Sequence, residues 1–359
     1  MRNYQVIKVA LVTLLFYCLL FLVILAGNQW NGRVFVLETP TDLPTGQTWG
    51  VGYDGRFSYA IATNPWGSTT NLDQPGFRYQ RILYPLIVYL LSLGNPHLVP
   101  WMMLMINLLS TFFGSAIFGM LLFRRGQSPW YGLIFFFSLG YLLSMRLDCL
   151  ESLAFCLAFA GWLAYDKHKR ALAIILFALG GLTKEVALLF PLALIIWESI
   201  NRAWKKAGLL LMCLLPYAVW YFILLLWFGM PGEQMAKSKL GWIPFYGLHY
   251  LNDPVSRLLI GLFVLLPGIF FGFLAICELV KGYRDESTKI LILILLEVAI
   301  IAMMPIPTWM DPIAILRLGL GLLAAIILWA SQLSRRALLF IAAYMAPSAL
   351  VFFLIPNIL

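Results

Sequence analysis

The first candidate catalytic residue in this sequence is Asp54, in the stretch GYDGRF at positions 52–57. A carboxylate held at the mouth of an apolar cavity can act as a general base, because partial loss of solvent raises its pKa towards neutral pH. The same residue stands just before an amphipathic stretch and can instead cap a helix that begins at Gly55. Local sequence alone leaves both interpretations open.

Two arginines, Arg78 and Arg81, follow in the stretch DQPGFRYQRILYP at positions 73–85. If this stretch is helical from Phe77, the two side chains share a face because they are three residues apart. Two guanidinium groups on one face suit a phosphate, whose oxygens arginine binds in pairs. Arginines that reach from a helix to lipid headgroups give the same pattern, so membrane anchoring is the alternative.

Asp148 and Glu151 stand three positions apart in RLDCLES, at 146–152. Paired carboxylates can hold a divalent metal ion or position a hydroxylated substrate. Acidic residues at the start of a helix also stabilise the helix dipole, which is a purely structural role. The spacing is not that of a DxD motif, so we do not predict a metal site from this pair.

Lys184 and Glu185 interrupt a long apolar segment, and Asp311 and Arg317 flank another. A charge at the centre of a bilayer costs about 2.5–3.5 kcal/mol on insertion scales, so Lys184 and Glu185 need partners or a wet cavity. A Lys–Glu pair that joins two short helices is the alternative. For Asp311 and Arg317 the alternative is a plain role at a helix end.

The elements that must position these residues are those of a membrane protein. The chain is 62% hydrophobic and only 11% charged, and its mean hydropathy of +0.87 is far outside the range of soluble domains. A span of about 30 Å of hydrocarbon takes about 20 apolar residues. The sequence therefore predicts an all-α polytopic bundle of about eleven transmembrane helices, near 5–26, 99–123, 131–146, 150–165, 171–183, 186–198, 207–228, 257–280, 290–304, 317–333 and 337–356.

Positive charge assigns the two sides of this bundle. With the N-terminus in the cytoplasm, five tight loops that contain most of the Lys and Arg residues fall inside, at 124–125, 167–170, 202–206, 281–289 and 335–336. This arrangement obeys the positive-inside rule. The net charge of +9 is thus a topology signal, and we expect no binding of nucleic acid.

We expect one integral-membrane domain over 1–359 with two long outer loops. The first, 27–98, contains two amphipathic stretches, Tyr53 to Thr63 and Phe77 to Leu93, that predict helices lying in the membrane interface. The second, 229–256, has aromatic residues suited to headgroup depth, among them Trp242 and Tyr246. The candidate site residues come from separate regions and all fall on the outer side, which predicts a recessed site between helices and outer loops.

At this point the chain resembles a C-type (GT-C fold) integral-membrane glycosyltransferase, of a bacterial branch akin to the mannosyltransferases of GPI-anchor assembly. The resemblance covers roughly residues 5–200. It rests on YDGRFSYAIA at 53–62, RYQRILYP at 78–85, and the run from DCLESL at 148–153 through KHKR at 167–170 to LTKE at 182–185. The last third matches only in hydrophobicity and in Arg317.

The resemblance implies transfer of a sugar from a polyprenyl-phosphate donor to an acceptor hydroxyl outside the cytoplasm, with inversion. It implies that Asp54 takes the proton of the acceptor hydroxyl. Residues of the other motifs become candidates for substrate binding, with the cations stabilising the departing lipid phosphate: Arg78, Arg81, Asp148, Glu151, Lys184, Glu185 and Arg317. Many relatives have two adjacent acids in the first loop, whereas Gly55 follows Asp54 here, and this difference weakens the case for a metal.

We therefore expect a polyprenyl-phosphate-sugar-dependent glycosyltransferase that uses no cofactor, although the sequence leaves a divalent metal open. Its expected partners are the lipid-linked sugar donor, a glycan, lipid or protein acceptor, and the lipid bilayer. Its expected location is the bacterial cytoplasmic membrane. The alternatives are a transporter or flippase of polyprenyl-linked sugars, which needs no base, and a non-catalytic membrane subunit with the same fold.

Overall fold

The computed structural model describes residues 3–36, 54–67, 72–230, 232, 241, 243–251, 253–282 and 286–354. Two residues of the sequence argument, Tyr53 and Trp242, lie outside the described residues. Within the described residues every regular element is a helix, which confirms the predicted all-α class. Large parts of both predicted outer loops, 27–98 and 229–256, also fall outside the description.

Six helices of the described chain are long and apolar enough to cross a membrane. Two of these six spans each consist of two consecutive helices joined by a single turn. The turns are the 3-10 turn η6 (Met212–Leu214) and the π-helical turn η8 (Gly261–Leu265). The six are α1 (Asn3–Gly27), α5 (Val99–Arg124), α11 (Trp204–Leu211) with α12 (Leu215–Phe228), α14 (Pro254–Ile260) with α15 (Leu266–Val280), α18 (Pro312–Leu333) and α19 (Arg335–Leu354). The predicted count of about eleven spans is not confirmed.

The remaining predicted segments are helices, but they are shorter. They form α6 (Leu133–Phe136), α7 (Leu139–Arg146), α8 (Glu151–Asp166), α9 (Arg170–Thr183), η5 (Glu185–Leu188), α10 (Leu189–Ile200) and α16 (Thr288–Ala302). Helices α8, α9 and α10 have 16, 14 and 12 residues. At 1.5 Å per residue they extend about 24, 21 and 18 Å, short of about 30 Å of hydrocarbon.

Local sequence explains where the elements end. Helix α9 stops because Lys184 takes an extended backbone conformation, with φ −159° and ψ 129°. Helix α18 starts with proline at its first position, and the Asp311 carboxylate accepts hydrogen bonds from the backbone N–H groups of Ile313 and Ala314 at 3.0 and 3.2 Å. Asp311 thus has the helix-end role that the sequence left as its alternative.

The core is aromatic where α5, α8 and α10 meet. Phe118 of α5 lies 4.5 Å from Phe159 of α8 between ring centroids, and Phe159 lies 5.9 Å from Phe190 of α10. All three rings are fully buried. Such clusters stabilise through buried apolar area and through edge-to-face contacts, so α8 is firmly fixed between its neighbours.

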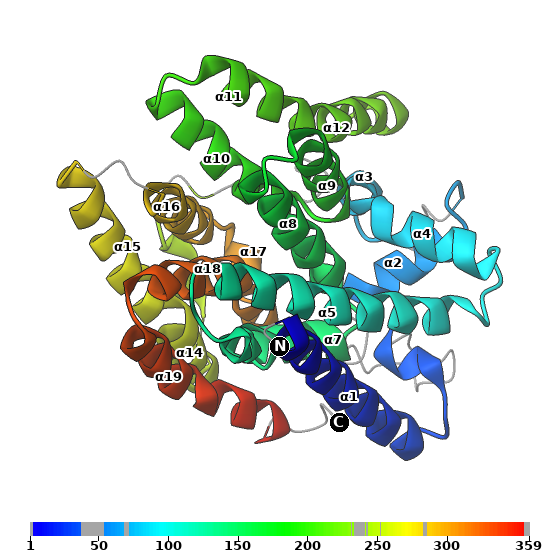
Figure 1. Cartoon of the computed structure of the whole chain (residues 1–359). Coiled ribbons are helices and arrows are strands. Elements are labelled where there is room, and N and C mark those ends of the chain that lie inside the picture. The colour runs from blue at the N-terminus through cyan, green and yellow to red at the C-terminus, as the bar shows by residue number, and fades with distance from the viewer. Residues whose placement is uncertain are drawn as a thin grey trace.

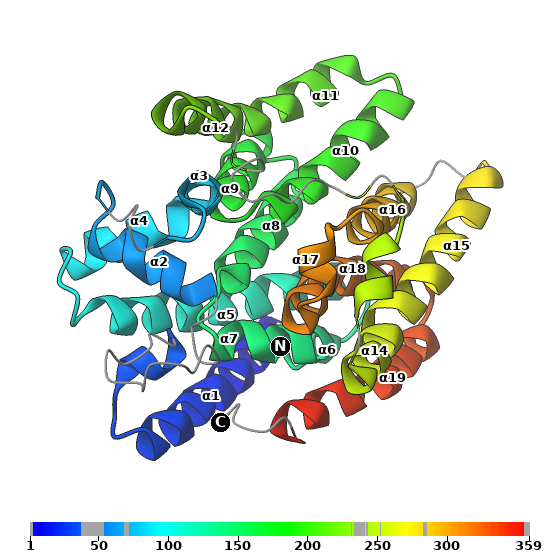
Figure 2. The same cartoon turned by 180° about the vertical axis from the view of Figure 1, so that it is seen from behind.

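Helix α8 lies at the centre of the molecule in both views (Figures 1 and 2). It packs against α9 on one side and α5 on the other. On one flank lie the short helices of the segment 27–98, predicted as the first outer loop: η1 (Gly32–Phe35), α2 (Asp54–Thr63), α3 (Pro75–Arg78), η3 (Tyr79–Arg81) and α4 (Leu83–Ser92). The other flank is formed by α14 to α19, which include α17 (Ile306–Trp309). The helical character of the two amphipathic stretches is as predicted.

Candidate active site

Asp54 opens α2 and binds arginines from two distant parts of the chain. Its Oδ1 accepts a hydrogen bond from Nη1 of Arg78 at 2.8 Å, and its Oδ2 accepts one from Nη1 of Arg317 at 3.1 Å. Nη1 of Arg81 lies 3.8 Å from the same Oδ2. The Asp54 side chain keeps 21% of its surface exposed, whereas that of Arg317 keeps 2%. Asp54 therefore stands between a buried cation and an accessible surface.

Close backbone packing fixes the position of Asp54. The next residue, Gly55, lies against the turn between α7 and α8, so close that a Cβ there would clash with the carbonyl oxygen of Leu147 and lie 3.1 Å from that of Asp148. Glycine is the residue that allows such an approach of two backbones. The glycine after Asp54 thus has a packing reason to be there.

Glu151, which is more deeply buried than Asp54, forms ion pairs with two buried cations. Oε1 of Glu151 accepts hydrogen bonds from Nε and Nη2 of Arg317 at 2.8 and 2.5 Å, and it also binds Nζ of Lys184. The Glu151 side chain has no exposed surface. Its other oxygen, Oε2, is buried and has no hydrogen-bond partner among the described residues. Buried charges of this kind persist only when they are paired.

Nearer the surface, Arg81 and Arg78 each bind a carboxylate with two nitrogens. Nε and Nη2 of Arg81 donate to Glu185 at 3.0 and 2.7 Å. Nε and Nη2 of Arg78 donate to Asp73 at 2.9 Å each, and the Arg78 guanidinium lies 3.8 Å from the centre of the Phe57 ring. Two-nitrogen pairing fixes the orientation of a guanidinium as well as its distance. Lys184 and Glu185, neighbours in sequence, thus bind different partners.

The charges of this site alternate and balance. Four cations and four carboxylates form one connected set, which we call the ion network: Asp54, Asp73, Arg78, Arg81, Glu151, Lys184, Glu185 and Arg317. An anion that enters therefore competes with a carboxylate for a cation, or binds N–H groups that the carboxylates leave free. The two most exposed cations of the network, Arg78 and Arg81 at 16% and 12%, are the ones that an anion reaches most easily.

The ion network sets the proton affinity of Asp54. Burial alone would raise the pKa of its carboxyl, but the nearby cations, first Arg317 and then Arg78, outweigh burial and hold the pKa well below its usual range. Asp54 is therefore ionised at neutral pH. An ionised carboxylate beside guanidinium groups can accept a proton once an added negative charge offsets those groups.

Asp148 lies apart from the ion network. It is fully buried, and its Oδ1 accepts hydrogen bonds from Nδ2 of Asn107 at 2.5 Å and from the Tyr84 hydroxyl at 3.2 Å. Its backbone has a positive φ of 49°. Asp148 and Glu151 thus do not share a ligand position. Among the described residues no group of three or more His, Cys, Asp or Glu side chains could hold a metal ion.

The ion network contains seven of the eight predicted site residues, all except Asp148, and the structure adds three residues that sequence reasoning missed. Asp73 binds Arg78, while Asn107 and Tyr84 hold Asp148. Asn107 carried a signal, because it is a polar residue inside an apolar helix, which predicts a buried hydrogen bond. Asp73 stood five residues before Arg78, with nothing in the sequence to show that the chain turns back.

Comparison of the chain with known protein families, with curated proteins and with solved structures returns no match.

Proposed function

We propose that this protein is a membrane glycosyltransferase that moves a sugar from a polyprenyl-phosphate donor to an acceptor hydroxyl, with Asp54 as the general base. One observation carries the proposal. A partly exposed carboxylate on α2 is bound by arginines from α3 and α18, far apart in sequence, and is next to a third. A site for chemistry on a phosphate-linked substrate needs this combination of a base and several cations.

In the proposed reaction, the acceptor oxygen attacks the anomeric carbon of the donor sugar. The bond between that carbon and the phosphate oxygen breaks, the proton of the acceptor hydroxyl passes to Asp54, and the polyprenyl phosphate leaves as an anion. A single displacement inverts the configuration at the anomeric carbon. No oxidant, reductant or further co-reactant is needed, and we propose that no cofactor takes part.

Arg78 and Arg81 are the proposed contacts of the donor phosphate, because they have more exposed surface than Arg317. A phosphate bound to Arg78 adds negative charge next to Asp54. This charge raises the proton affinity of the carboxylate, since a nearby anion disfavours its ionised form. Donor binding therefore converts Asp54 from a weak base into a more effective one. Lys184 and Arg317, which are buried with Glu151, are proposed to position this arrangement.

Membrane placement supports the same proposal. The described chain has six helices that can cross a bilayer, so a lipid-linked substrate can approach from the side. We propose that the Asp54 end faces outward from a bacterial cytoplasmic membrane and that the N-terminus lies in the cytoplasm. The acceptor is proposed to be a glycan, lipid or protein presented on that outer side.

The experiment that tests the proposal is the turnover of a polyprenyl-phosphate sugar by the purified full chain in detergent. Asp54→Asn keeps the shape of the side chain and removes the base, so we expect kcat to fall by about 10²–10⁴-fold while donor binding persists. Asp73→Asn is the matched control, because Asp73 also binds Arg78 and does not contact Arg317. We expect its kcat within a few-fold of wild type.

Equal turnover by wild type and Asp54→Asn would refute the base. Movement of the lipid-linked sugar across vesicles by both proteins, without any glycosylated product, would show a transporter in place of an enzyme.

A further inference from the structure

A second charged site lies at the opposite end of α8, α9 and α10 from Asp54. There a cavity of about 620 Å³ is lined by residues from the ends of several helices. Asp166 ends α8, whose first residue is Glu151 of the ion network, so about 24 Å of helix separates the two sites. The cavity volume lies within the range of about 300–1,000 Å³ typical of small-molecule sites.

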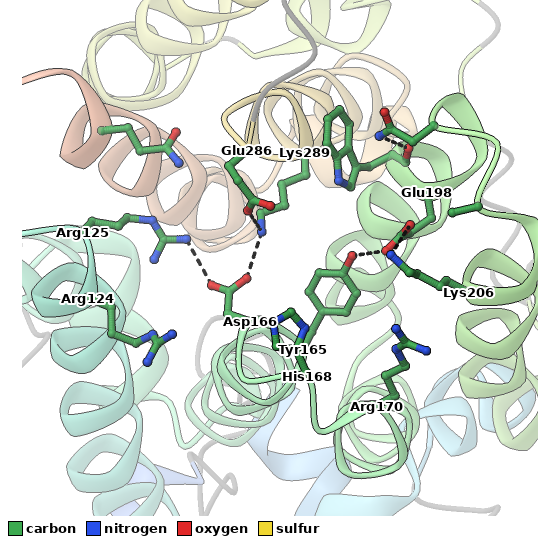
Figure 3. A pocket seen from close by; sticks show the side chains of 14 residues that line it. Arg124, Arg125, Tyr165, Asp166, His168, Arg170, Glu198, Lys206, Glu286 and Lys289 are labelled. Atoms are coloured by element: carbon green, nitrogen blue, oxygen red, sulfur yellow. Dashed lines mark hydrogen bonds and ion pairs between the residues drawn. The ribbon is translucent and has the colours of Figure 1, made fainter.

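The cavity brings together four of the loops that the sequence places on the inner side. Figure 3 shows their side chains arranged in a ring around the opening. Its ionisable residues of the acidic, basic and imidazole types are Arg124, Arg125, Asp166, His168, Arg170, Glu198, Lys206, Glu286 and Lys289. The aromatic side chains of Tyr165 and Trp197 form part of the wall.

The three carboxylates of this cavity are already bound to cations. Asp166 accepts from Nζ of Lys289 at 2.9 Å and lies 3.5 Å from Nη2 of Arg125. Glu286 lies 2.5 Å from the same Lys289 nitrogen. Glu198 lies 3.6 Å from Nζ of Lys206 and accepts a hydrogen bond from the Tyr165 hydroxyl at 2.5 Å. No carboxylate of the described lining is left to neutralise a further cation.

Two cations of the lining, Arg124 and Arg170, have no partner among the described residues. The Arg124 and Arg170 side chains make no hydrogen bond or ion pair with described residues. The Nε of Arg125 is buried and has no hydrogen-bond partner within the described chain. A buried N–H without a partner costs free energy, but this atom has almost no accessible surface, so the accessible unpaired donors of the lining are those of Arg124 and Arg170. The cavity thus has unused donors and an excess of positive charge.

We propose that this cavity is a binding site for a phosphate group, held by Arg124 and Arg170. Guanidinium groups bind phosphate oxygens in pairs and stay charged at all relevant pH values. Two sources can supply this chemistry at the end of a helical bundle, the headgroup of an anionic phospholipid or a soluble phosphate ester. The site is independent of Asp54 and its reaction, and it stands whether or not the proposed function does.

The test uses the purified full chain and two probes. Inorganic pyrophosphate, titrated by calorimetry in neutral detergent, represents the soluble source. Retention of phosphatidylglycerol against phosphatidylcholine, measured by lipid analysis after reconstitution with an equal mixture, represents the lipid source. The variant is Arg124→Gln with Arg170→Gln, and the matched control is Arg336→Gln, an exposed arginine of α19 outside the cavity lining.

One of the two probes should bind the double variant at least about tenfold more weakly than it binds wild type, a loss of about 1.4 kcal/mol. The affinity of Arg336→Gln for that probe should equal the affinity of wild type. Weaker pyrophosphate binding by the double variant identifies a soluble ligand. Weaker retention of phosphatidylglycerol, with pyrophosphate binding unchanged, identifies a lipid. Arg78→Ala is titrated in parallel, because this variant removes any pyrophosphate binding at the ion network around Asp54. Equal binding of both probes by wild type and the double variant overturns the proposal. Arg170→Gln alone gives the same answer if the double variant does not fold.

Discussion

At the scale of single residues, the ionisation of Asp54 depends on the cations around it. It is a carboxylate between three guanidinium groups, one of them almost completely buried. The same cations that are proposed to receive a phosphate also keep Asp54 ionised before the substrate arrives. Substitutions in the ion network therefore test two effects, the binding of a phosphate and the ionisation of Asp54.

The first prediction concerns pH. Because its folded-state pKa lies below the ordinary value, Asp54 stays ionised as the pH falls through about 4, the ordinary value for Asp. The stabilisation from its ion pairs is present above that pH and is lost only as the pH falls further, through the lowered pKa. We expect kcat/KM, which reports the free enzyme, to show no loss from Asp54 above about pH 4. Arg78→Gln removes one cation and should move the acid limb upward. An acid limb near neutrality that Arg78→Gln leaves unchanged would contradict this assignment.

The second prediction compares two arginines of the ion network. Arg317→Ala leaves Glu151 and Asp54 short of a buried partner, and breaking a buried pair costs about 3–5 kcal/mol. Arg78→Ala removes a partly exposed partner of Asp54, for which we expect a loss of about 1 kcal/mol or less. Unfolding of the purified variants in detergent measures both. Equal losses would show that Arg317 has no special structural role.

At the scale of elements, the site depends on how closely α2 approaches the turn before α8. The approach occurs at Gly55, where a backbone oxygen occupies the space that a side chain would need. Small displacements of reacting groups lower catalytic rates strongly. The position of α2 is therefore part of the proposed catalytic arrangement.

The third prediction tests this packing. Gly55→Ala must move α2 away from the turn, so we expect a loss of turnover of about 10²-fold with only a partial loss of stability. Gly208→Ala is the matched control, because apart from its chain neighbours and the backbone of its own helix no described atom lies within 4 Å of the position that its Cβ would take. Alanine favours a helix over glycine, so this variant should be as active as wild type and at least as stable. Full activity of Gly55→Ala would show that the close packing is not needed.

At the scale of the whole molecule, charged residues gather at two ends of one helical core. The ion network occupies one end of α8, and the second cavity occupies the other. Residues from four loops that lie far apart in sequence meet at the second cavity. Which end faces the cytoplasm is a separate matter that labelling decides.

The fourth prediction concerns this orientation. In intact cells a thiol reagent that cannot cross membranes should label Tyr246→Cys, at the end near α17, and should miss Trp204→Cys at the start of α11. Both side chains are exposed, at 47% and 66%, so accessibility within the protein does not decide the result. Permeabilised cells should label both. The reverse pattern would invert the proposed topology.

The sequence predicted the helical class of the protein better than it predicted the number of spans or the partners of the site residues. Apolar runs identified helices correctly, and the runs at 171–183 and 186–198, which the sequence already showed to be shorter than a full span, form helices of 14 and 12 residues with a break at Lys184. Hydrophobicity records which residues avoid water and does not fix how far each helix extends. Likewise the sequence identified Arg317 as a candidate, but its contact with Asp54 spans 263 positions, and nothing local encodes such pairing.

The short length of α8 has an electrical consequence. In the proposed membrane placement its two ends carry the carboxyl groups of Glu151 and Asp166, about 24 Å apart. If water reaches both ends, the layer across which a voltage falls is thinner here than the surrounding bilayer of about 30 Å. A transmembrane voltage that falls across the thinner layer gives a steeper local gradient, worth about 2.3 kcal/mol per 100 mV for a full elementary charge that crosses it. An energised membrane would therefore act most strongly on charged substrates at this point of the protein.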